Sequence, residues 1–187
     1  MLPGKRHPAA VAIDGSEWFD QPGGEQVEVW APRAEWAADG ARWRAAIAEA
    51  VAAAVRIEHI GSTAIPNLPA KPVIDLQLSV PDIEDETSYR PALESLGLVL
   101  RQRAPDHRFF RPPAGAPRTV HVHVCAAGSR WEHDHVRFRD LLRERPDLAA
   151  EYGRLKIDLA QRFPHDRAAY NSGKSAFIAS AVALPND

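Results

Sequence analysis

The sequence predicts an α/β or α+β fold with a mixed β-sheet and a helical C-terminal tail. Two segments, 73–80 and 118–125, alternate apolar with polar residues, which is the period of a β-strand with one buried face. Segment 34–54 is rich in alanine and carries large apolar residues at helical spacing. The last third has helical periodicity interrupted at Pro146 and Pro164. Strands interrupted by one helix and followed by helices are typical of these fold classes.

Composition limits the class of protein. The 187 residues are 45% hydrophobic and 26% charged, which is typical of one globular domain. The 23 Lys and Arg residues against 25 Asp and Glu residues argue against a general nucleic-acid coat protein, without excluding a local basic patch, and a nucleic-acid-binding role ranks last. The single cysteine, Cys125, excludes an internal disulfide. No apolar run approaches the ~20 residues of a membrane helix, and the start lacks the apolar core of a signal peptide, so we expect a cytoplasmic protein.

The N-terminal half begins with an expected flexible arm over residues 1–26, because prolines and glycines interrupt any periodicity there. A single domain is expected over 27–187. In the predicted helix 34–54, Trp36, Trp43, Ile47 and Val51 share a face that we interpret as core packing. A short strand is expected over 56–60, and an irregular loop over 61–72, where prolines disfavour regular structure.

Two strands are expected to present polar side chains on the same face of the sheet. Asp75 and Gln77 alternate with apolar neighbours in 73–80, as His121 and His123 do in 118–125. Between them we expect a helix over 85–96, closed by Gly97, and strands over 98–101 and 108–111. We expect the helices to cover the apolar face and leave the polar face open.

Three helices are expected in the C-terminal tail. Ser129 and Glu132 have the spacing of a capping box, which predicts a helix from there to about Arg145. Pro146 suits the first turn of the next helix, and a third helix follows Pro164.

The segment from Gly61 to Asp75 carries the clearest chemical signal. A Gly-Ser turn presents backbone N–H groups and the hydroxyl of Ser62, which can bind phosphate oxygens. Asp75 lies in mid-strand, where a carboxylate needs a counter-charge or a metal such as Mg²⁺. A salt bridge is the alternative, with Lys71, Arg56 or Arg101 as the partner.

Histidines and lysines extend the candidate set. His121 and His123 share a strand face and could bind a metal, although an ordinary polar face or phosphate contact is the alternative. Lys174 follows Tyr170 by one helical turn, and Lys156 lies on the preceding helix. Lysine is a good point charge for phosphate, whereas a solvated helix face is the alternative.

Three sequence blocks resemble the signature of the GrpB family, also called UPF0157. The first is Glu58-His59-Ile60-Gly61-Ser62-Thr63-Ala64-Ile65-Pro66, followed by Leu68 and by Ala70-Lys71-Pro72-Val73-Ile74-Asp75. The second is His121-Val122-His123-Val124, and the third comprises Phe138-Arg139-Asp140, Leu142-Arg143, Tyr152, Leu155-Lys156, Tyr170 and Lys174. The resemblance covers the chain from about Val27 to Val182.

That resemblance implies a nucleotidyltransferase-like fold: a mixed sheet with helices on one face and a C-terminal helical tail. In that superfamily a Gly-Ser turn precedes a strand whose paired carboxylates hold two divalent metals. Gly61 and Ser62 match the turn, Asp75 matches the first carboxylate, and Gln77 stands where the second is expected. An amide is a weaker Mg²⁺ ligand than a carboxylate, so the second metal position departs from the family pattern.

We therefore hypothesise a nucleotidyltransferase-like enzyme that binds a nucleoside triphosphate, or another phosphorylated small molecule, with Mg²⁺ or Mn²⁺. Its predicted catalytic residues are Asp75, Gln77 and His123, and its predicted metal ligands are Asp75, His121 and His123. Its predicted phosphate-binding residues are Gly61, Ser62, Thr63, Lys71, Lys156, Tyr170 and Lys174.

Two further hypotheses remain open. One is a nucleotide- or phosphate-binding module without catalysis, which the amide at position 77 favours. The other is a metalloenzyme that uses His121, His123 and Asp75 with zinc or manganese.

Overall fold

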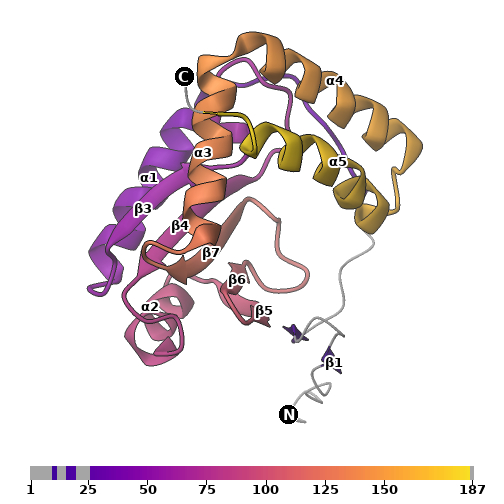
Figure 1. Ribbon diagram of the computed structural model, residues 1–187. Coiled ribbons are helices and arrows are strands. Elements are labelled where there is room, and N and C mark those ends of the chain that lie inside the picture. The colour runs from indigo at the N-terminus through magenta and orange to yellow at the C-terminus, as the bar shows by residue number, and fades with distance from the viewer. Residues whose placement is uncertain (1–9, 12–15, 20–25, 186–187) are drawn as a thin grey trace.

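The central element is a seven-stranded mixed sheet with strand order β1-β2-β5-β6-β7-β4-β3 (Figure 1). The computed structural model describes residues 10–11, 16–19 and 26–185. The strands are β1 (Ala10–Val11), β2 (Glu17–Trp18), β3 (Arg56–Ile60), β4 (Ile74–Val80), β5 (Val99–Ala104), β6 (His107–Arg111) and β7 (Val120–Ala126). The helices are α1 (Glu35–Ala50), α2 (Arg90–Ser95), α3 (Arg130–Glu144), α4 (Pro146–Arg162) and α5 (Arg167–Val182), with 3-10 turns η1 (Ser62–Ala64) and η2 (Glu86–Ser88).

The pairing of β4 with β7 positions the candidate site. These two strands are parallel, whereas every other neighbouring pair in the described sheet is antiparallel. In their register Asp75 lies opposite His121, and Gln77 lies opposite His123. Because side chains alternate along a strand, all four project from the same face, as the sequence predicts.

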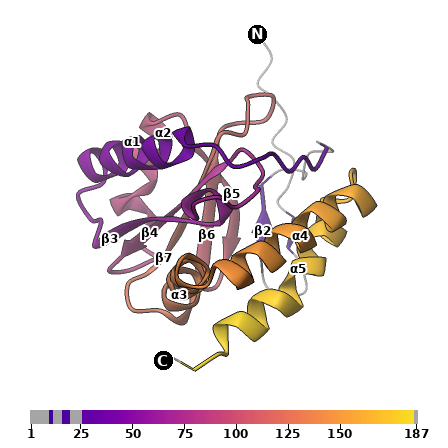
Figure 2. The ribbon, with the colours of Figure 1, turned by 90° about the horizontal axis from the view of Figure 1, so that it is seen from above.

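The opposite face of β4 and β7 forms the main core. Leu76, Leu78, Val122 and Val124 are each 0% exposed, and α1 and α2 cover them. Figure 2 shows α1 and α2 on one side of the sheet and α3, α4 and α5 on the other. Complete burial of an aliphatic side chain contributes ~1.5–3 kcal/mol, so this layer supplies much of the stabilisation.

The C-terminal tail folds across the polar face. The Ser129 hydroxyl accepts a hydrogen bond from the Glu132 N–H at 3.2 Å, which caps α3 as predicted. The carboxylate of Glu132 accepts from the Ser79 hydroxyl at 2.9 Å and from the Gly128 N–H. This buried contact attaches the start of α3 to β4. The expectation of an open polar face is therefore wrong at this end of the strand.

The predicted arrangement, with helices on one face of the sheet and a C-terminal helical tail, is confirmed. Most predicted helices and strands begin and end within a few residues of their predicted bounds. Helix α1 ends at Ala50, earlier than the predicted 54. Segment 62–64 forms a 3-10 turn inside the predicted irregular loop. The helix expected over 85–96 is divided into η2 and α2 at Tyr89. The buried hydroxyl of Tyr89 donates to the Ile83 carbonyl at 2.6 Å, a tertiary contact that the periodicity does not report.

The predicted arm over residues 1–26 falls mostly outside the described residues and stays a prediction. The described strands β1 and β2 pair with each other, and β2 pairs with β5. Within the described ranges, no helix is both long enough and apolar enough to cross a membrane.

Candidate metal centre and cationic cavity

Asp75, His121 and His123 form a compact cluster of potential metal ligands on β4 and β7. His121 Nδ1 lies 3.0 Å from Asp75 Oδ1, and His123 Nε2 lies 3.7 Å from the same oxygen. One ligand atom from each of the three residues can be chosen so that all lie within 4.8 Å of one another. The predicted metal-ligand set is therefore brought together by the parallel register of the two strands.

The partners of Asp75 make its carboxylate strongly acidic. Burial alone would raise the pKa of Asp75, but the hydrogen bonds and charges of His121 and His123 hold that pKa well below its usual range. Burial lowers the pKa of His121, although Asp75 opposes this effect. Asp75 thus contacts two histidines, and Arg56, one of the partners considered for the alternative salt bridge, pairs with Glu58 at 2.9 Å.

The donor set fits a divalent cation. Among the described residues, His121 Nε2 is buried without a hydrogen-bond partner. A buried nitrogen of this kind is costly unless a donor or a metal satisfies it. Two imidazoles and one carboxylate favour Mn²⁺ or Zn²⁺ over Mg²⁺, which prefers oxygen ligands.

His107, a residue that the sequence analysis did not identify, supports this cluster. Its Nε2 lies 2.9 Å from His123 Nδ1, so a hydrogen bond between the rings leaves His123 Nε2 directed toward Asp75. The His107 ring also stacks on Trp131, with ring centroids 4.9 Å apart. Such contacts behind a metal-binding histidine commonly fix its tautomer and ring orientation.

Gly61 lies directly against the Asp75 carboxylate. Its φ is 69°, in the left-handed region, and a Cβ added there would lie 2.5 Å from Asp75 Oδ2. Only glycine therefore fits this turn without displacement of the carboxylate. Ser62 follows in the cavity wall, which Tyr152 also lines.

Thr63 was predicted to bind phosphate, but its hydroxyl has structural partners. It donates to the Val73 carbonyl at 3.0 Å, and His59 Nε2 donates to it at 3.0 Å. The hydroxyl is thus committed to holding the 61–65 segment against β3 and β4. The phosphate-binding role of Thr63 stays a prediction.

A cavity of about 980 Å³ opens beside the candidate metal ligands and is strongly cationic. Among the described residues, eight lysine and arginine side chains line it: Lys71, Arg101, Arg111, Arg118, Arg130, Lys156, Arg167 and Lys174. Its described carboxylates are Asp75 and Asp134. This charge balance favours an anionic ligand, although the chain as a whole carries a formal net charge of −2.

Three of the four lysines in the whole chain meet at this cavity. The ammonium groups of Lys71 and Lys174 lie 5.1 and 4.6 Å from the centre of the Tyr170 ring. Burial, followed by repulsion from Lys174 in the case of Lys71, lowers the pKa of Lys71 to about 8. Burial likewise lowers the pKa of Lys174 to about 8. Two partly neutral lysines beside an aromatic ring indicate a site that an anion would stabilise.

Lys156 is more deeply placed than predicted. It is 1% exposed, and its Nζ donates to the Pro69 carbonyl and lies 4.8 Å from the centre of the Tyr152 ring. Burial, together with Lys174 and Lys71, lowers its pKa to about 7. Lys156 therefore holds the loop before β4 and adds charge from within the cavity wall.

Gln77 does not join the site. It is 0% exposed, its amide nitrogen donates to Ser79 Oγ at 3.3 Å, and it is absent from the described lining of the cavity. Its position under the start of α3 explains this separation, because α3 contacts Ser79 two residues further along β4. The residue at the position where the resemblance predicts a second carboxylate is thus a buried amide.

These features define a mixed α/β protein with a two-histidine, one-aspartate cluster at the edge of a cationic cavity. The chain belongs to the GrpB family, because the model described as GrpB protein matches residues 26–183.

Similar proteins support this assignment. A UPF0157 protein of Streptomyces coelicolor is 41% identical over 145 residues, which cover 78% of this chain and 76% of that protein. A UPF0157 protein of Pseudomonas aeruginosa is 37% identical over 178 residues, which cover 92% and 72%. The crystal structure of the conserved protein GrpB from Enterococcus faecalis has a TM-score of 0.74 and 32% identity, and the match covers 83% of this chain and 94% of that one.

Proposed function

We propose that the protein binds a phosphorylated small molecule together with one divalent cation, and that the ligand is a nucleoside triphosphate. The observation that carries this proposal is the position of Asp75, His121 and His123 at the wall of a cavity whose described lining includes eight lysine and arginine side chains. A metal and cationic side chains that converge on one cavity are the usual means of binding and activating phosphate esters.

Each part of the cavity has a role in this proposal. Asp75, His121 and His123 would hold the cation, and Mn²⁺ suits these ligands better than Mg²⁺. Lys71 and Lys174 would neutralise phosphate oxygens as point charges. The backbone of Gly61 brings the chain close to the Asp75 carboxylate, so a phosphate that reaches the metal also meets this turn.

The proposed reaction is transfer of a nucleotidyl group to an acceptor hydroxyl or amine, with release of pyrophosphate. The bound cation would supply Lewis-acid stabilisation of charge on the phosphate oxygens. A two-metal mechanism is not supported, because Gln77 is buried away from the cavity. This same observation favours a second candidate function, namely binding of the metal-nucleotide complex without turnover.

A thermal-shift titration tests the binding step. ATP, GTP, CTP and UTP would each be added with and without Mn²⁺, Mg²⁺ or Zn²⁺, using wild type, Asp75→Asn and Asp134→Asn. Asp134 is the matched control, because it lines the same cavity but pairs with Arg130 at 3.2 Å. A ligand at a hundredfold over its Kd would stabilise wild type by about 2.7 kcal/mol.

We expect metal-dependent stabilisation of wild type and Asp134→Asn, and none of Asp75→Asn. Stabilisation that is the same with and without metal would contradict the metal part of the proposal. Absence of any nucleotide effect would contradict the ligand part. Pyrophosphate release, measured on the nucleotide that stabilises most strongly, then separates nucleotidyl transfer from binding alone.

A further inference from the structure

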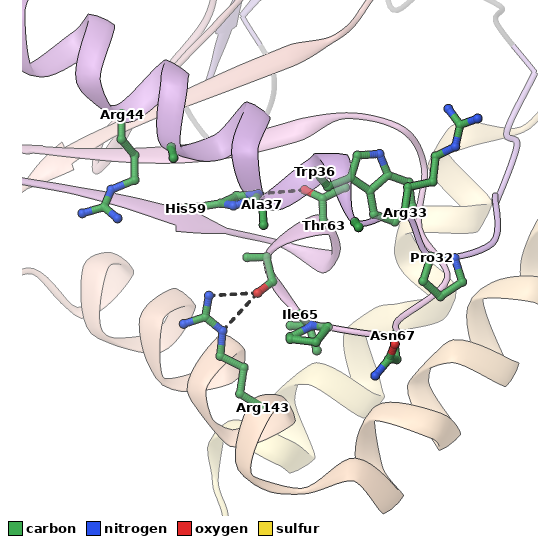
Figure 3. Close-up of a pocket in the computed structure, with 14 residues that line it drawn as sticks. Pro32, Arg33, Trp36, Ala37, Arg44, His59, Thr63, Ile65, Asn67 and Arg143 are labelled. Carbon is green, nitrogen blue, oxygen red and sulfur yellow. Dashed lines mark hydrogen bonds between the residues drawn. The ribbon is translucent and has the colours of Figure 1, made fainter.

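A second cavity lies on the other side of the 61–65 segment from the candidate metal ligands. It encloses about 670 Å³ between the start of α1, the turn η1 and the end of α3 (Figure 3). Thr63 lines both cavities, and its hydroxyl is held by the His59 ring and the Val73 carbonyl. The segment is therefore a wall between two cavities, and a ligand in the second one does not reach Asp75.

The charged side chains in the described lining of this second cavity are all positive. Arg33, Arg44 and Arg143 line it, and none of its described lining residues is acidic. Arg143 donates two hydrogen bonds to the Ala64 carbonyl, at 3.0 and 2.8 Å, and its Nη1 lies 3.6 Å from Asp140 Oδ1, so its guanidinium is fixed beside the turn. Arg44 Nε donates to the Ile57 carbonyl at 3.1 Å, and no described carboxylate lies within ion-pair distance of Arg44. The two terminal nitrogens of Arg44 thus remain available to an anion.

The remaining walls are apolar or neutral. Trp36 is buried in the wall formed by α1, and Figure 3 shows it close to Thr63 and Arg33. Burial, reinforced by Arg143, Arg139 and Arg44, lowers the pKa of His59 to about 4, so its ring is neutral near pH 7. An oxyanion at the arginines with an apolar body against Trp36 matches these surroundings.

We propose that this cavity is a second ligand site, which takes a small molecule bearing a phosphate or carboxylate group, with Arg44 binding the oxyanion and Arg143 adding positive charge to the wall. It is independent of the proposed nucleotide site, because the 61–65 wall separates the two. Guanidinium groups suit both anions, since their paired N–H donors match the geometry of phosphate and carboxylate oxygens.

The test is a titration of the metal-free, full-length ¹⁵N-labelled protein with inorganic phosphate and, separately, with acetate. The Trp36 indole N–H and the Ala64 amide report on the second cavity, and the Tyr170 amide reports on the first. We expect Arg44→Met to weaken binding at the Trp36 and Ala64 reporters at least tenfold, and Arg44→Lys to weaken it less. Arg42→Met, on the same helix but paired with Asp39, is the control and should have no effect.

Lys174→Met should change the Tyr170 response and leave the Trp36 response within twofold. The two anions decide the ligand chemistry, because a saturable Trp36 response to phosphate alone indicates a phosphate group and a response to acetate indicates a carboxylate. A Trp36 response that is absent with both anions, or equal in Arg44→Met and Arg42→Met, would overturn the proposal. If the Tyr170 amide alone fails to respond to either anion, the result contradicts anion binding in the first cavity and leaves this proposal standing.

Discussion

At the scale of single residues, the site depends on how tightly the backbone fits the Asp75 carboxylate. Gly61 has a positive φ, and its missing Cβ is the space that Asp75 Oδ2 occupies. Gly97 also has a positive φ, of 80°, but an added Cβ there meets no atom within 4 Å. A comparison of alanine substitutions at these two glycines therefore separates the cost of backbone strain from the cost of a steric clash.

We predict that Gly97→Ala lowers the free energy of unfolding by about 1–2 kcal/mol, the cost of a left-handed non-glycine residue. Gly61→Ala should lower it by at least about 3 kcal/mol, because the clash adds to the strain. Urea denaturation of the two variants beside wild type measures both values. Equal losses in the two variants would show that Asp75 moves aside freely.

His107 offers a prediction about metal affinity. Because it orients the His123 ring, His107→Asn should weaken Mn²⁺ binding about 10–100-fold, the usual effect of losing such a partner. His133→Asn is the matched control, since His133 is exposed on α3. Isothermal titration calorimetry with Mn²⁺ gives the two dissociation constants. A His107 variant that binds as tightly as the control would exclude this positioning role.

The role of His107 could not be predicted from the sequence. It depends on the antiparallel register of β6 and β7, in which Phe109 lies opposite His123. Asp75 was different, because a carboxylate in the middle of an apolar strand already indicates a special environment.

At the scale of elements, the attachment of α3 to the sheet closes one end of the polar face. Glu132 is 4% exposed, and its carboxylate accepts from Ser79 and from the Gly128 N–H. Glu132→Ala leaves both donors without this partner, so we predict a loss of about 2–3 kcal/mol in the free energy of unfolding. Glu144→Ala, exposed on the same helix, should change it by less than about 0.5 kcal/mol. Thermal and urea unfolding measure the loss of stability in both variants. Similar losses would contradict the role of Glu132 in attaching α3 to the sheet.

The individual elements were largely predictable, but their assembly was not. Alternation in 73–80 and 118–125 predicted both strands and the shared face of Asp75 and His121. The same alternation does not predict whether the two strands run parallel, nor where the C-terminal helices pack. One of the contacts that hold α3 against the sheet is the buried carboxylate of Glu132, which resembles an ordinary capping residue in the sequence.

At the scale of the whole molecule, a chain of nearly balanced charge concentrates its lysines in one cavity. The pKa values of Lys71, Lys156 and Lys174 are lowered to about 8, 7 and 8, against about 10.4 in an unfolded chain. Between about pH 7 and pH 10 the unfolded chain therefore holds more protons than the folded one. Stability rises with pH wherever the unfolded state binds more protons.

We accordingly predict that the ligand-free protein becomes more stable as the pH increases from about 7 toward 10. Lys174→Met should flatten this increase, because it removes one of the three lysines and also removes its repulsion of the other two. Urea denaturation at a series of pH values measures the slope for both proteins. The lysines would be excluded as the cause if the stability of wild type fell over this pH range, or if the variant's stability rose with pH as steeply as that of wild type.

The convergence of these lysines also explains why net charge was a poor guide to the ligand. The formal charge of −2 describes the whole surface, whereas the cavity brings together residues from the loop before β4 and from α4 and α5. The tail helices were predicted as elements, but only their packing places Lys156 and Lys174 near Asp75.

The most direct test of the central claim is a calorimetric titration of Mn²⁺ into metal-free protein. We predict one Mn²⁺ site per chain in wild type and in Asp134→Asn. In Asp75→Asn the affinity should fall by at least about a hundredfold, because the anionic ligand is lost and only the two histidines remain. Binding of equal strength in Asp75→Asn and wild type, or no binding to wild type, would contradict a metal centre at Asp75, His121 and His123.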